Sequence, residues 1–445
     1  MALRTEAACL LETGALYGLR VMFQPEQGDP IFAGFKQGAF SLYYGDEPIF
    51  HFDREGRWQR AFVQGIHYLK GLDATVQAID RVREGKNMIL KRRTLSFSEA
   101  SDLDASIRGV AISLSDALTS GKLRRVEPPA KEGIDPMSNL LLLDVLERVA
   151  RWDASAWFAY REKYLAAYGV LPFLPADCQS SLIVQGTLGH KGGSAFGGGP
   201  ASPYHARSPQ EFVDHVRAVR RLVGTRLLQC RQVFLAGGDV LTRPFDDLES
   251  MLNTIEVNLL DAPLDESTGE LAWIGQLAHR LNAIHAFLDQ PGEVSLSTDQ
   301  WLSLREHRLE RVIVGVESGN PDIRRSFEKH WENATFQALV ESLKQAGIGV
   351  GIVVLVGAGG ERSAEQHVSE TARLVNSLPL APGDLVSLMD LREFQGNAST
   401  LTGEGPLSGE QWARELSAHK EALSPSRKER GVKIVPYSLE KQGLG

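Results

Sequence analysis

Residues that could do chemistry gather first in a glycine-rich stretch between Thr187 and Pro200. It holds one imidazole, that of His190, among glycines whose backbone can approach a ligand closely because they carry no Cβ. Backbone NH groups in such a loop can hold a carboxylate or a phosphate. The stretch is not a P-loop, because it lacks the Gly-Lys-Ser/Thr ending. His190 is a candidate general base or carboxylate donor, with a plain hydrogen bond to the backbone as the alternative.

Three later segments share one design, in which an apolar run ends in glycine close to a carboxylate or hydroxyl group. A carboxylate on such a turn can accept a hydrogen bond from an ammonium group or a ribose hydroxyl. Taken singly, each glycine fits a tight turn and each charge fits a protein surface. The last segment is not a dinucleotide fingerprint, because Arg362 stands where the third glycine would be. The segments are Gly237-Gly238-Asp239, Gly315-Val316-Glu317-Ser318 and Gly357-Ala358-Gly359.

In their order along the chain, the four segments resemble the radical S-adenosylmethionine (SAM) superfamily, in particular its coproporphyrinogen-dehydrogenase-like and elongator-like branches. That family places Cys-x3-Cys-x-aromatic-Cys after a Thr-x-Gly turn. Here Phe196 keeps the aromatic position, while His190, Ser194 and Gly197 stand where the cysteines would be. Glycine has no ligand atom, and a serine hydroxyl is a poor donor to iron. We therefore expect a radical-SAM-like protein that lacks the cluster-binding cysteines, with no [4Fe-4S] cluster and no reductive cleavage of SAM.

The resemblance also implies roles for residues of the other segments. The first would contact the SAM amino group, the second would border the SAM site, and the third would close the adenosine pocket. Expected cofactor contacts are Gly237, Gly238, Asp239, Glu317, Ser318, Gly357 and Gly359. Expected proton-handling residues are His190 and Lys329, the latter standing where family members have a lysine one helical segment after the second site segment.

Alternating short apolar runs and amphipathic stretches between residues 180 and 392 predict an α/β fold with a parallel sheet. Six strands suit a partial (β/α)6 TIM-like barrel of the radical SAM type, in which ligands lie at the carboxyl ends of the strands. The expected strands are 181–187, 232–236, 294–298, 311–316, 348–356 and 385–389. The expected helices are 208–224, 245–258, 271–288 and 334–346.

The sequence predicts further units on both sides of this barrel. An N-terminal α+β unit spans 1–125, with two strands around Gly45-Asp46 and helices at 72–84 and 97–120. A linker and bridging helix occupy 126–179, and Pro128-Pro129 marks the linker. Residues 393–445 form a C-terminal extension with a helix at 408–423 and an extended segment at 432–437.

Composition and charge argue against a nucleic-acid-binding, membrane-spanning or secreted protein. A net charge of −8 argues against a broad surface for binding nucleic acid. No apolar run reaches the ~18 residues of a membrane span, and Glu6 and Glu12 interrupt the apolar start of the chain. Three widely separated cysteines fit a reducing compartment, and we expect a cytoplasmic protein with no metal site.

The leading hypothesis is a cluster-free, SAM-binding enzyme. Because SAM is already an electrophile, a positioned base or nucleophile suffices for alkyl transfer, cyclisation or elimination on a small-molecule substrate. One alternative is a non-catalytic protein that keeps the fold as a binding or partner module. Another is that the glycine loop binds a different nucleotide or metabolite.

Overall fold

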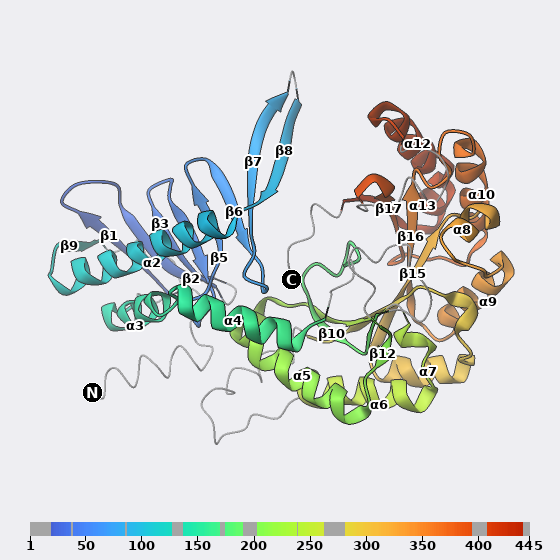
Figure 1. Ribbon diagram of the computed structural model, residues 1–445, viewed down its shortest axis with the longest axis horizontal. Coiled ribbons are helices and arrows are strands. Elements are labelled where there is room, and N and C mark those ends of the chain that lie inside the picture. Colours follow the sequence, from blue (N-terminus) through green and yellow to red (C-terminus); the bar gives the residue numbers. More distant parts are fainter. Residues whose placement is uncertain are drawn as a thin grey trace.

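Two large sheets of different construction organise the protein, as the computed structural model shows (Figure 1). One is antiparallel and belongs to the N-terminal unit. The other is parallel and carries the candidate site. The structure describes residues 19–36, 39–84, 87–126, 137–169, 174–189, 203–237, 239–261, 281–393 and 407–438.

The antiparallel sheet has nine strands in the order β8-β7-β6-β5-β4-β3-β2-β1-β9. The predicted hairpin around Gly45 is confirmed, because β3 pairs with β4 in antiparallel register. The predicted helix at 72–84 is wrong, since Val76–Glu84 forms a strand in which Val76 and Ala78 alternate into the core. The strands are β1 (Arg20–Pro25), β2 (Ile31–Lys36), β3 (Ala39–Tyr44), β4 (Ile49–Phe52), β5 (Trp58–Val63), β6 (Ile66–Lys70), β7 (Val76–Glu84), β8 (Asn87–Thr94) and β9 (Leu123–Val126).

The predicted helix at 97–120 is confirmed as α2 (Phe97–Thr119), which crosses this sheet (Figure 1). It begins at a capping box, in which the Ser96 side chain accepts from the Glu99 backbone NH and the Glu99 side chain accepts from the Ser96 NH. Asp104 on the helix accepts a hydrogen bond from the indole of Trp58 at 2.6 Å and pairs with the Lys70 ammonium at 2.7 Å. These contacts fix the helix to strands β5 and β6.

Two helices, rather than the single bridging helix expected, follow the N-terminal unit. They are α3 (Asn139–Ala150) and α4 (Ala154–Ala167), and Asp153 caps the second of them. The Arg108 guanidinium of α2 donates to the Ala150 carbonyl at the end of α3, at 2.7 Å. Helix α4 packs between the two units, and the Tyr160 hydroxyl donates to the carbonyl of Leu222 in the parallel-sheet unit.

A buried arginine joins the two units directly. Arg57, which immediately precedes β5, binds the Asp53 carboxylate through its Nε at 2.6 Å. Its two terminal nitrogens donate to the carbonyls of Leu222 and Val223 at 2.6 and 2.7 Å. The guanidinium therefore satisfies carbonyl groups at the end of a helix in the other unit, where the helix leaves such groups without partners of its own.

The second sheet has seven strands, all parallel and in chain order. The predicted α/β architecture with a parallel sheet is confirmed. The seventh strand extends the sheet past residue 392, where the sequence places the end of the barrel. The strands are β10 (Ser181–Gln185), β13 (Gln232–Ala236), β14 (Ile284–Leu288), β15 (Leu309–Glu317), β16 (Gly349–Val356), β17 (Leu385–Asp390) and β18 (Lys433–Tyr437).

The third strand of this sheet lies ten residues before its predicted position. Ile284–Leu288 is buried throughout and pairs with both neighbours, whereas 294–298 contains no strand. The predicted helix at 271–288 is thereby wrong over 284–288, and residues 271–280 lie outside the described residues. A strand buried on both faces shows no polar alternation, so its apolar run is easily mistaken for part of a helix.

Helices separate the strands and lie outside the sheet (Figure 1). Helix α5 shows why: Phe212, Val216 and Val219 recur every three to four residues and are fully buried. No helix among the described residues combines the length and apolar character that crossing a membrane needs. The helices are α5 (Pro209–Val223), α6 (Phe245–Ile255), α7 (Thr298–Glu306), α8 (Pro321–Ser326), α9 (Asn333–Gln345), α10 (Ala364–Ser377), α12 (Gly409–Ala422) and α13 (Ser424–Arg430).

The last strand also contacts the segment that leads into the first one. The Tyr437 hydroxyl donates to the Leu174 carbonyl, and the Gln179 side-chain amide donates to the Tyr437 hydroxyl at 3.2 Å. Tyr437 ends β18, and Gln179 lies two residues before β10. The two ends of the strand order are thus linked through side chains.

Candidate functional site

The predicted segments come together at the carboxyl ends of the parallel strands. Thr187 follows β10, Gly237 and Asp239 follow β13, Glu317 ends β15 and Gly357 follows β16. Neighbouring parallel strands end at the same edge of a sheet, which is where ligands bind in α/β folds. Two other predicted site residues, His190 and Gly238, lie outside the described residues.

Thr187 and Gly237 make the closest approach at this edge. Gly237 has a φ of +121°, and a Cβ there would come closer than 3.0 Å to the Thr187 hydroxyl. Only glycine fits such a position. Thr187 is 1% exposed, and its hydroxyl has no hydrogen-bond partner within the described part of the chain. A buried hydroxyl without a partner is costly, so the position suits a hydrogen bond to a ligand.

Asp239 lies beside this contact and is also buried. It immediately precedes a short 3-10 turn over Val240–Thr242, and the Thr242 hydroxyl donates to its backbone carbonyl at 2.9 Å. Burial, followed by the nearby Asp239 carboxylate, raises the pKa of Tyr204. Tyr204 directly precedes β12 (His205–Ala206), which pairs with β11 (Thr187–Leu188), so this short ribbon brings the phenol near Asp239. Sequence reasoning missed Tyr204, because no spacing rule links it to Asp239.

The structure brings Glu317 and Lys329 together in a buried ion pair. Their charged atoms lie 2.6 Å apart, and Asp289, which follows β14, adds a carboxylate oxygen 3.0 Å from the same ammonium. The Lys329 ammonium also donates to the Gly315 carbonyl at 2.5 Å and to the Asp289 carbonyl at 3.1 Å. All its donors are therefore engaged, which favours a role in holding the strand ends over one in moving a proton.

Burial and charge act against each other in this cluster. Burial raises the pKa of Glu317 to about 7, although the Lys329 ammonium opposes the rise. Burial disfavours the charged lysine, but the carboxylates of Asp289 and Glu317 outweigh it and raise the pKa of Lys329. Lys329 thus stays charged at neutral pH, and Glu317 is the member of the cluster whose carboxyl group gains or loses its proton near neutral pH.

The backbone at Glu317 is unusual. Its φ is +57°, and the register between β15 and β16 shifts between Gly315 and Glu317. A Cβ at Gly315 would lie 2.8 Å from the Lys329 ammonium and 2.9 Å from a Glu317 carboxylate oxygen. Glycine at 315 leaves the space that the ion pair fills. Such a strained non-glycine residue in a buried cluster is a feature of functional sites.

Ser318 faces the protein interior. It is fully buried, its hydroxyl lies 2.7 Å from Nδ1 of His367, and it accepts from the Asn320 backbone NH at 3.0 Å. His367 Nε2 donates to the Leu355 carbonyl at 3.0 Å, which leaves Nδ1 as the acceptor for the serine hydroxyl. Burial, and then His419, lower the pKa of His367 to about 3, so this histidine is neutral.

We expect Ser318→Ala to destabilise the protein by about 1–3 kcal/mol, because two buried groups lose their partner. We expect it to change the affinity for SAM, the ligand that the sequence resemblance implies, less than twofold, because the hydroxyl points to His367 and not to the strand-end space. Urea unfolding and calorimetric titration with SAM measure the two effects. A large loss of SAM affinity in a stably folded variant would show instead that Ser318 contacts the cofactor.

The glycines after β16 are also engaged within the protein. The Gly357 backbone NH donates to the Glu415 carboxylate of α12 at 2.6 Å. Gly359 packs against the start of α10, where a Cβ would lie 2.8 Å from the Ser363 carbonyl oxygen. Gly357, with φ of +97°, remains at the strand edge. Glu415 therefore occupies the NH group that a cofactor contact at Gly357 would use.

Glu415 belongs to a buried cluster that sequence reasoning missed. It lies 3.7 Å from ring nitrogens of both His367 and His419. The only sequence signal is the Glu-x-x-x-His spacing on α12, which puts Glu415 and His419 on one face. The cluster ties α12 to α10 behind the strand-end turn.

Both described cysteines lie at the opposite edge of the sheet. Cys178 precedes β10 and Cys230 precedes β13, at the amino ends of the strands. Burial, and then Asp177, raise the pKa of the Cys178 thiol, and burial raises that of Cys230 to about 12. Neither thiol is a reactive thiolate, and both lie at the opposite ends of the strands from the candidate site.

Two comparisons of the sequence find no match for this chain: no protein-family model and no curated protein matches it.

Solved structures of radical SAM enzymes match parts of the fold. Coproporphyrinogen III oxidase HemN from Escherichia coli matches with 15% identity and a TM-score of 0.39, over 62% of this chain and 57% of that one. The archaeal Elp3 of Methanocaldococcus infernus matches with 15% identity and a TM-score of 0.37, over 57% and 55%. The methyltransferase TsrM from Kitasatospora setae, bound to tryptophan and a SAM analogue, matches with 11% identity and a TM-score of 0.38, over 62% and 59%.

The matched part is limited in each case. This chain spans little more than half the length of these three proteins, and 34% of the length of TsrM in a second structure. Overlap of this extent defines no family.

Proposed function

We propose that this protein binds SAM at the carboxyl ends of its parallel strands and uses it, without an iron-sulfur cluster, in polar chemistry. The observation that carries the proposal is the convergence of Thr187, Gly237 and Asp239. There a buried hydroxyl, which has no partner among the described residues, lies beside a glycine that leaves room and a buried carboxylate. SAM presents an ammonium, a carboxylate and ribose hydroxyls, which are the groups that such a set can bind.

The proposal includes a partial barrel of the radical SAM type. In a flat sheet, the first and last of seven strands would lie about 29 Å apart, at roughly 4.8 Å per strand. Tyr437 of the last strand instead contacts Leu174 and Gln179, which precede the first. Strong curvature of the sheet accounts for that link, and the unbroken chain order of the strands is also what a barrel requires.

We propose that no cluster is bound because the residues at the expected ligand positions are poor iron ligands. The positions of the glycine loop that would carry thiolates hold His190, Ser194 and Gly197. The described cysteines lie at the far edge of the sheet. A sulfonium is an electrophile without electron transfer, so alkyl transfer, cyclisation or elimination needs only a placed nucleophile or base.

Asp239 would bind the ammonium group of SAM, and the Thr187 hydroxyl would hydrogen-bond to the same ligand. The Glu317–Lys329 pair would fix the far side of the site. Its ammonium is fully engaged, which leaves His190 and Tyr204 as the candidates for proton handling near the ligand.

The engagement of Lys329 also favours the second candidate function, a non-catalytic SAM-binding or partner module. In that case the fold would bind SAM and a partner without consuming the cofactor. Product analysis after incubation with SAM separates the two functions. Turnover to a demethylated, cyclised or eliminated product supports the enzyme, whereas binding without turnover supports the module.

We expect purified protein to bind SAM in calorimetric titration and Asp239→Asn to weaken that binding about tenfold or more. The loss of one charge-assisted hydrogen bond of about 1.5–3 kcal/mol accounts for this factor. Asp246→Asn is the matched control, because Asp246 is exposed on α6, and we expect its affinity to stay within twofold of wild type. Thr187→Val, which removes only the hydroxyl, should weaken binding in the same direction.

Two results would contradict this proposal. Failure of the folded wild-type protein to bind SAM would remove its basis. Stoichiometric iron and sulfide in protein purified without oxygen would show that a cluster is bound after all.

A further inference from the structure

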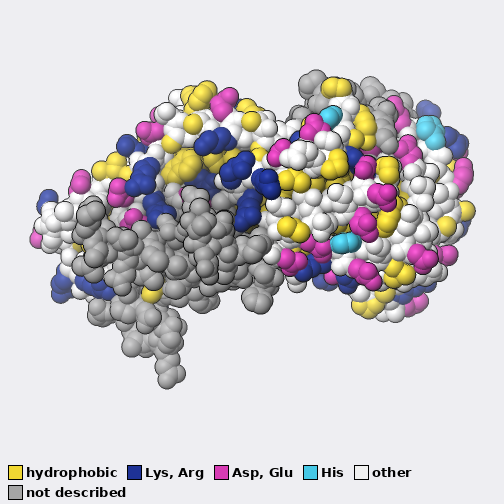
Figure 2. Space-filling model, turned by 90° about the horizontal axis from the view of Figure 1, so that it is seen from below, with side chains coloured by type: hydrophobic (Ala, Val, Ile, Leu, Met, Phe, Trp, Pro, Cys, Tyr) yellow, Lys and Arg dark blue, Asp and Glu magenta, His cyan; other side chains and the backbone are white. Residues whose placement is uncertain are grey.

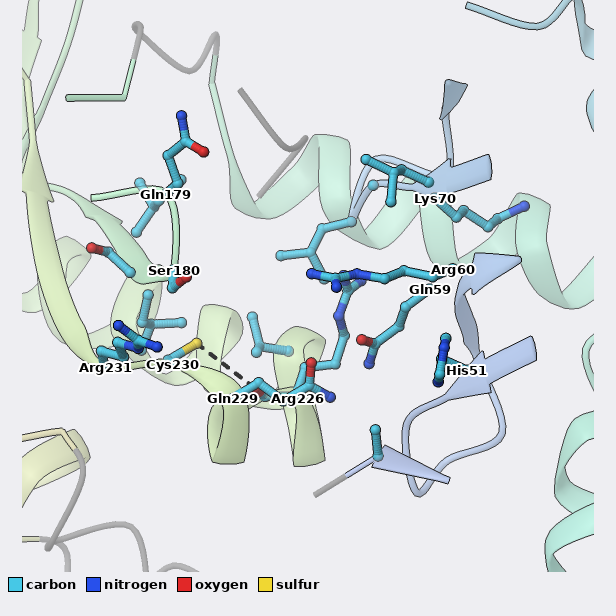
Figure 3. Close-up of a pocket in the computed structure, with 18 of the residues that line it drawn as sticks. His51, Gln59, Arg60, Lys70, Gln179, Ser180, Arg226, Gln229, Cys230 and Arg231 are labelled. Carbon is cyan, nitrogen blue, oxygen red and sulfur yellow. Dashed lines mark hydrogen bonds between the residues drawn. The ribbon is translucent and has the colours of Figure 1, made fainter. Parts of the chain in front are cut away.

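A cavity of about 840 Å³ lies between the two units, away from the strand-end site (Figure 3). Strands β3 to β7 of the N-terminal sheet line one side of it. The other side is formed by residues 179–183, which lead into and begin β10, and by residues 223–231, which precede β13. Its volume falls in the range of small-molecule sites, which is roughly 300–1,000 Å³. The part of β10 that lines this wall is its first half, which lies before the turn that carries Thr187.

The charged groups in this cavity are all basic. Arg60, Arg226 and Arg231 line it together with Lys70, and no aspartate or glutamate is among the described lining residues. Lys70 is balanced by its ion pair with Asp104. The described residues supply no ion pair and no side-chain hydrogen bond to the three arginines. Although the Asp53 carboxylate attracts Arg226, the residues that line the cavity carry an excess of positive charge in a protein whose net charge is −8.

The three arginines reach the cavity from both units. In Figure 3, Arg60 stands with Gln59 and His51 on the N-terminal side, and Arg231 lies across the space from them, while Arg226 lies between the two. On one face of the whole molecule, Lys and Arg side chains also gather over the N-terminal half (Figure 2). Guanidinium groups that line one cavity from opposite walls suit an anion with several oxygen atoms.

Neutral donors add to this preference. Gln59 is 7% exposed, and its side-chain NH2 has no partner within the described ranges. The NH2 group of Gln229 is also buried without a partner there. Buried NH groups without acceptors are costly, and a bound anion would satisfy them. Tyr43 and Tyr164, both part-exposed, provide aromatic surface in the same cavity.

We propose that this cavity between the units binds a nucleotide, with its phosphate groups on Arg60, Arg226 and Arg231 and its planar base against the tyrosines. Phosphate oxygens match the guanidinium and amide donors, and an aromatic ring matches the tyrosine surface. The two walls belong to different units, so the bound nucleotide holds them together. This second site does not depend on SAM binding at the strand ends.

The test uses the full chain and magnesium-free ATP as the probe, with calorimetric titration. We expect ATP to bind, and its affinity to fall as salt is added, because the contacts are ionic. Arg60→Gln combined with Arg231→Gln should weaken ATP binding at least about tenfold. Both arginines are exposed, so the fold should persist, which thermal melting checks. The matched control is Arg217→Gln with Arg221→Gln on the outer face of α5, for which we expect less than a twofold change.

Several outcomes would overturn the proposal. They are the absence of ATP binding at low salt, and an equal loss of affinity in the control variant. Tripolyphosphate that binds as tightly as ATP would show that no base is recognised and would refute the nucleotide. SAM titrated into the Arg60 and Arg231 variant separates the two sites: unchanged SAM affinity supports a distinct site, and joint loss refutes it. A protein that binds ATP but not SAM would contradict only the strand-end proposal.

Discussion

Replacing Lys329 by methionine should lower the free energy of unfolding by about 3–5 kcal/mol, because it leaves buried carboxylates without their counter-charge. Glu317 is 2.6 Å and Asp289 3.0 Å from the ammonium that the substitution removes. Methionine preserves most of the volume, so the loss reports the charge rather than a cavity. Urea unfolding measures it, and Lys428→Met on exposed helix α13 is the control, with an expected change below about 0.5 kcal/mol.

The same substitution should have a characteristic dependence on pH. The folded-state pKa of Glu317, about 7, lies above its ordinary value of 4.5, so the unfolded chain releases this proton first. Stability from this group therefore falls as the pH rises between those two values. Without Lys329 the folded-state pKa rises further and the loss continues to higher pH. Lys329→Met should thus be less destabilising at about pH 5 than at about pH 8. An equal effect at both pH values would show that Glu317 is not the group left unpaired.

Replacing Arg57 by methionine should be equally damaging and should act on the junction between the units. The change leaves the fully buried Asp53 carboxylate alone and removes the donors from two helix-end carbonyls, so we expect a loss of about 3–5 kcal/mol. Burial already raises the pKa of Asp53 to about 6 with the arginine present, which shows how poorly this site tolerates an unpaired charge.

Two measurements separate a loss at the junction from a general loss of stability. Limited proteolysis of Arg57→Met should release the two units as stable fragments, and its unfolding curve should split into two transitions. Arg151→Met is the control, because Arg151 pairs with Glu147 on the exposed face beyond α3 and should change stability by less than about 0.5 kcal/mol. A single, unshifted transition in Arg57→Met would mean that other contacts hold the units together.

Sequence reasoning predicts the fold best where local signals agree with tertiary packing. Pro209–Val223 has a capping box, a proline in its first turn and a clear apolar face, and it forms a helix within one residue of its predicted bounds. The third strand, predicted ten residues too late, shows the opposite situation. Val294 and Leu296 alternate with serines and resemble a half-buried strand, while Ile284–Leu288 is buried throughout and apolar except for His285. The prediction of a helix at 72–84 is wrong for a similar reason. Val76 and Ile79 match the period of a helix, but pairing with β6 makes this segment a strand.

The sequence predicts where the backbone of the candidate site lies better than it predicts the contacts that its side chains and NH groups make. A glycine or carboxylate after an apolar run indicates the end of a strand. Gly237, Asp239 and Glu317 accordingly lie at the carboxyl ends of the parallel strands, as predicted. Whether a given group stays available for a ligand depends on contacts from distant residues. Glu415, 58 residues away from Gly357, occupies its NH, and no local pattern indicates this. The arginine-lined cavity escapes sequence reasoning for the same reason, because its walls come from two units.

The link between Tyr437 and the segment before β10 has a consequence for how the chain is made. The residues that it joins are 258 and 263 positions apart. During synthesis, the first strands of the parallel sheet leave the ribosome long before β18 does. Contacts of such long range form late, and unfinished sheets expose apolar edges in the meantime. The strands of the N-terminal sheet pair almost entirely with their neighbours in sequence, so this sheet can fold before the rest of the chain is synthesised. The parallel sheet can be completed only after its last strand, β18, has been synthesised.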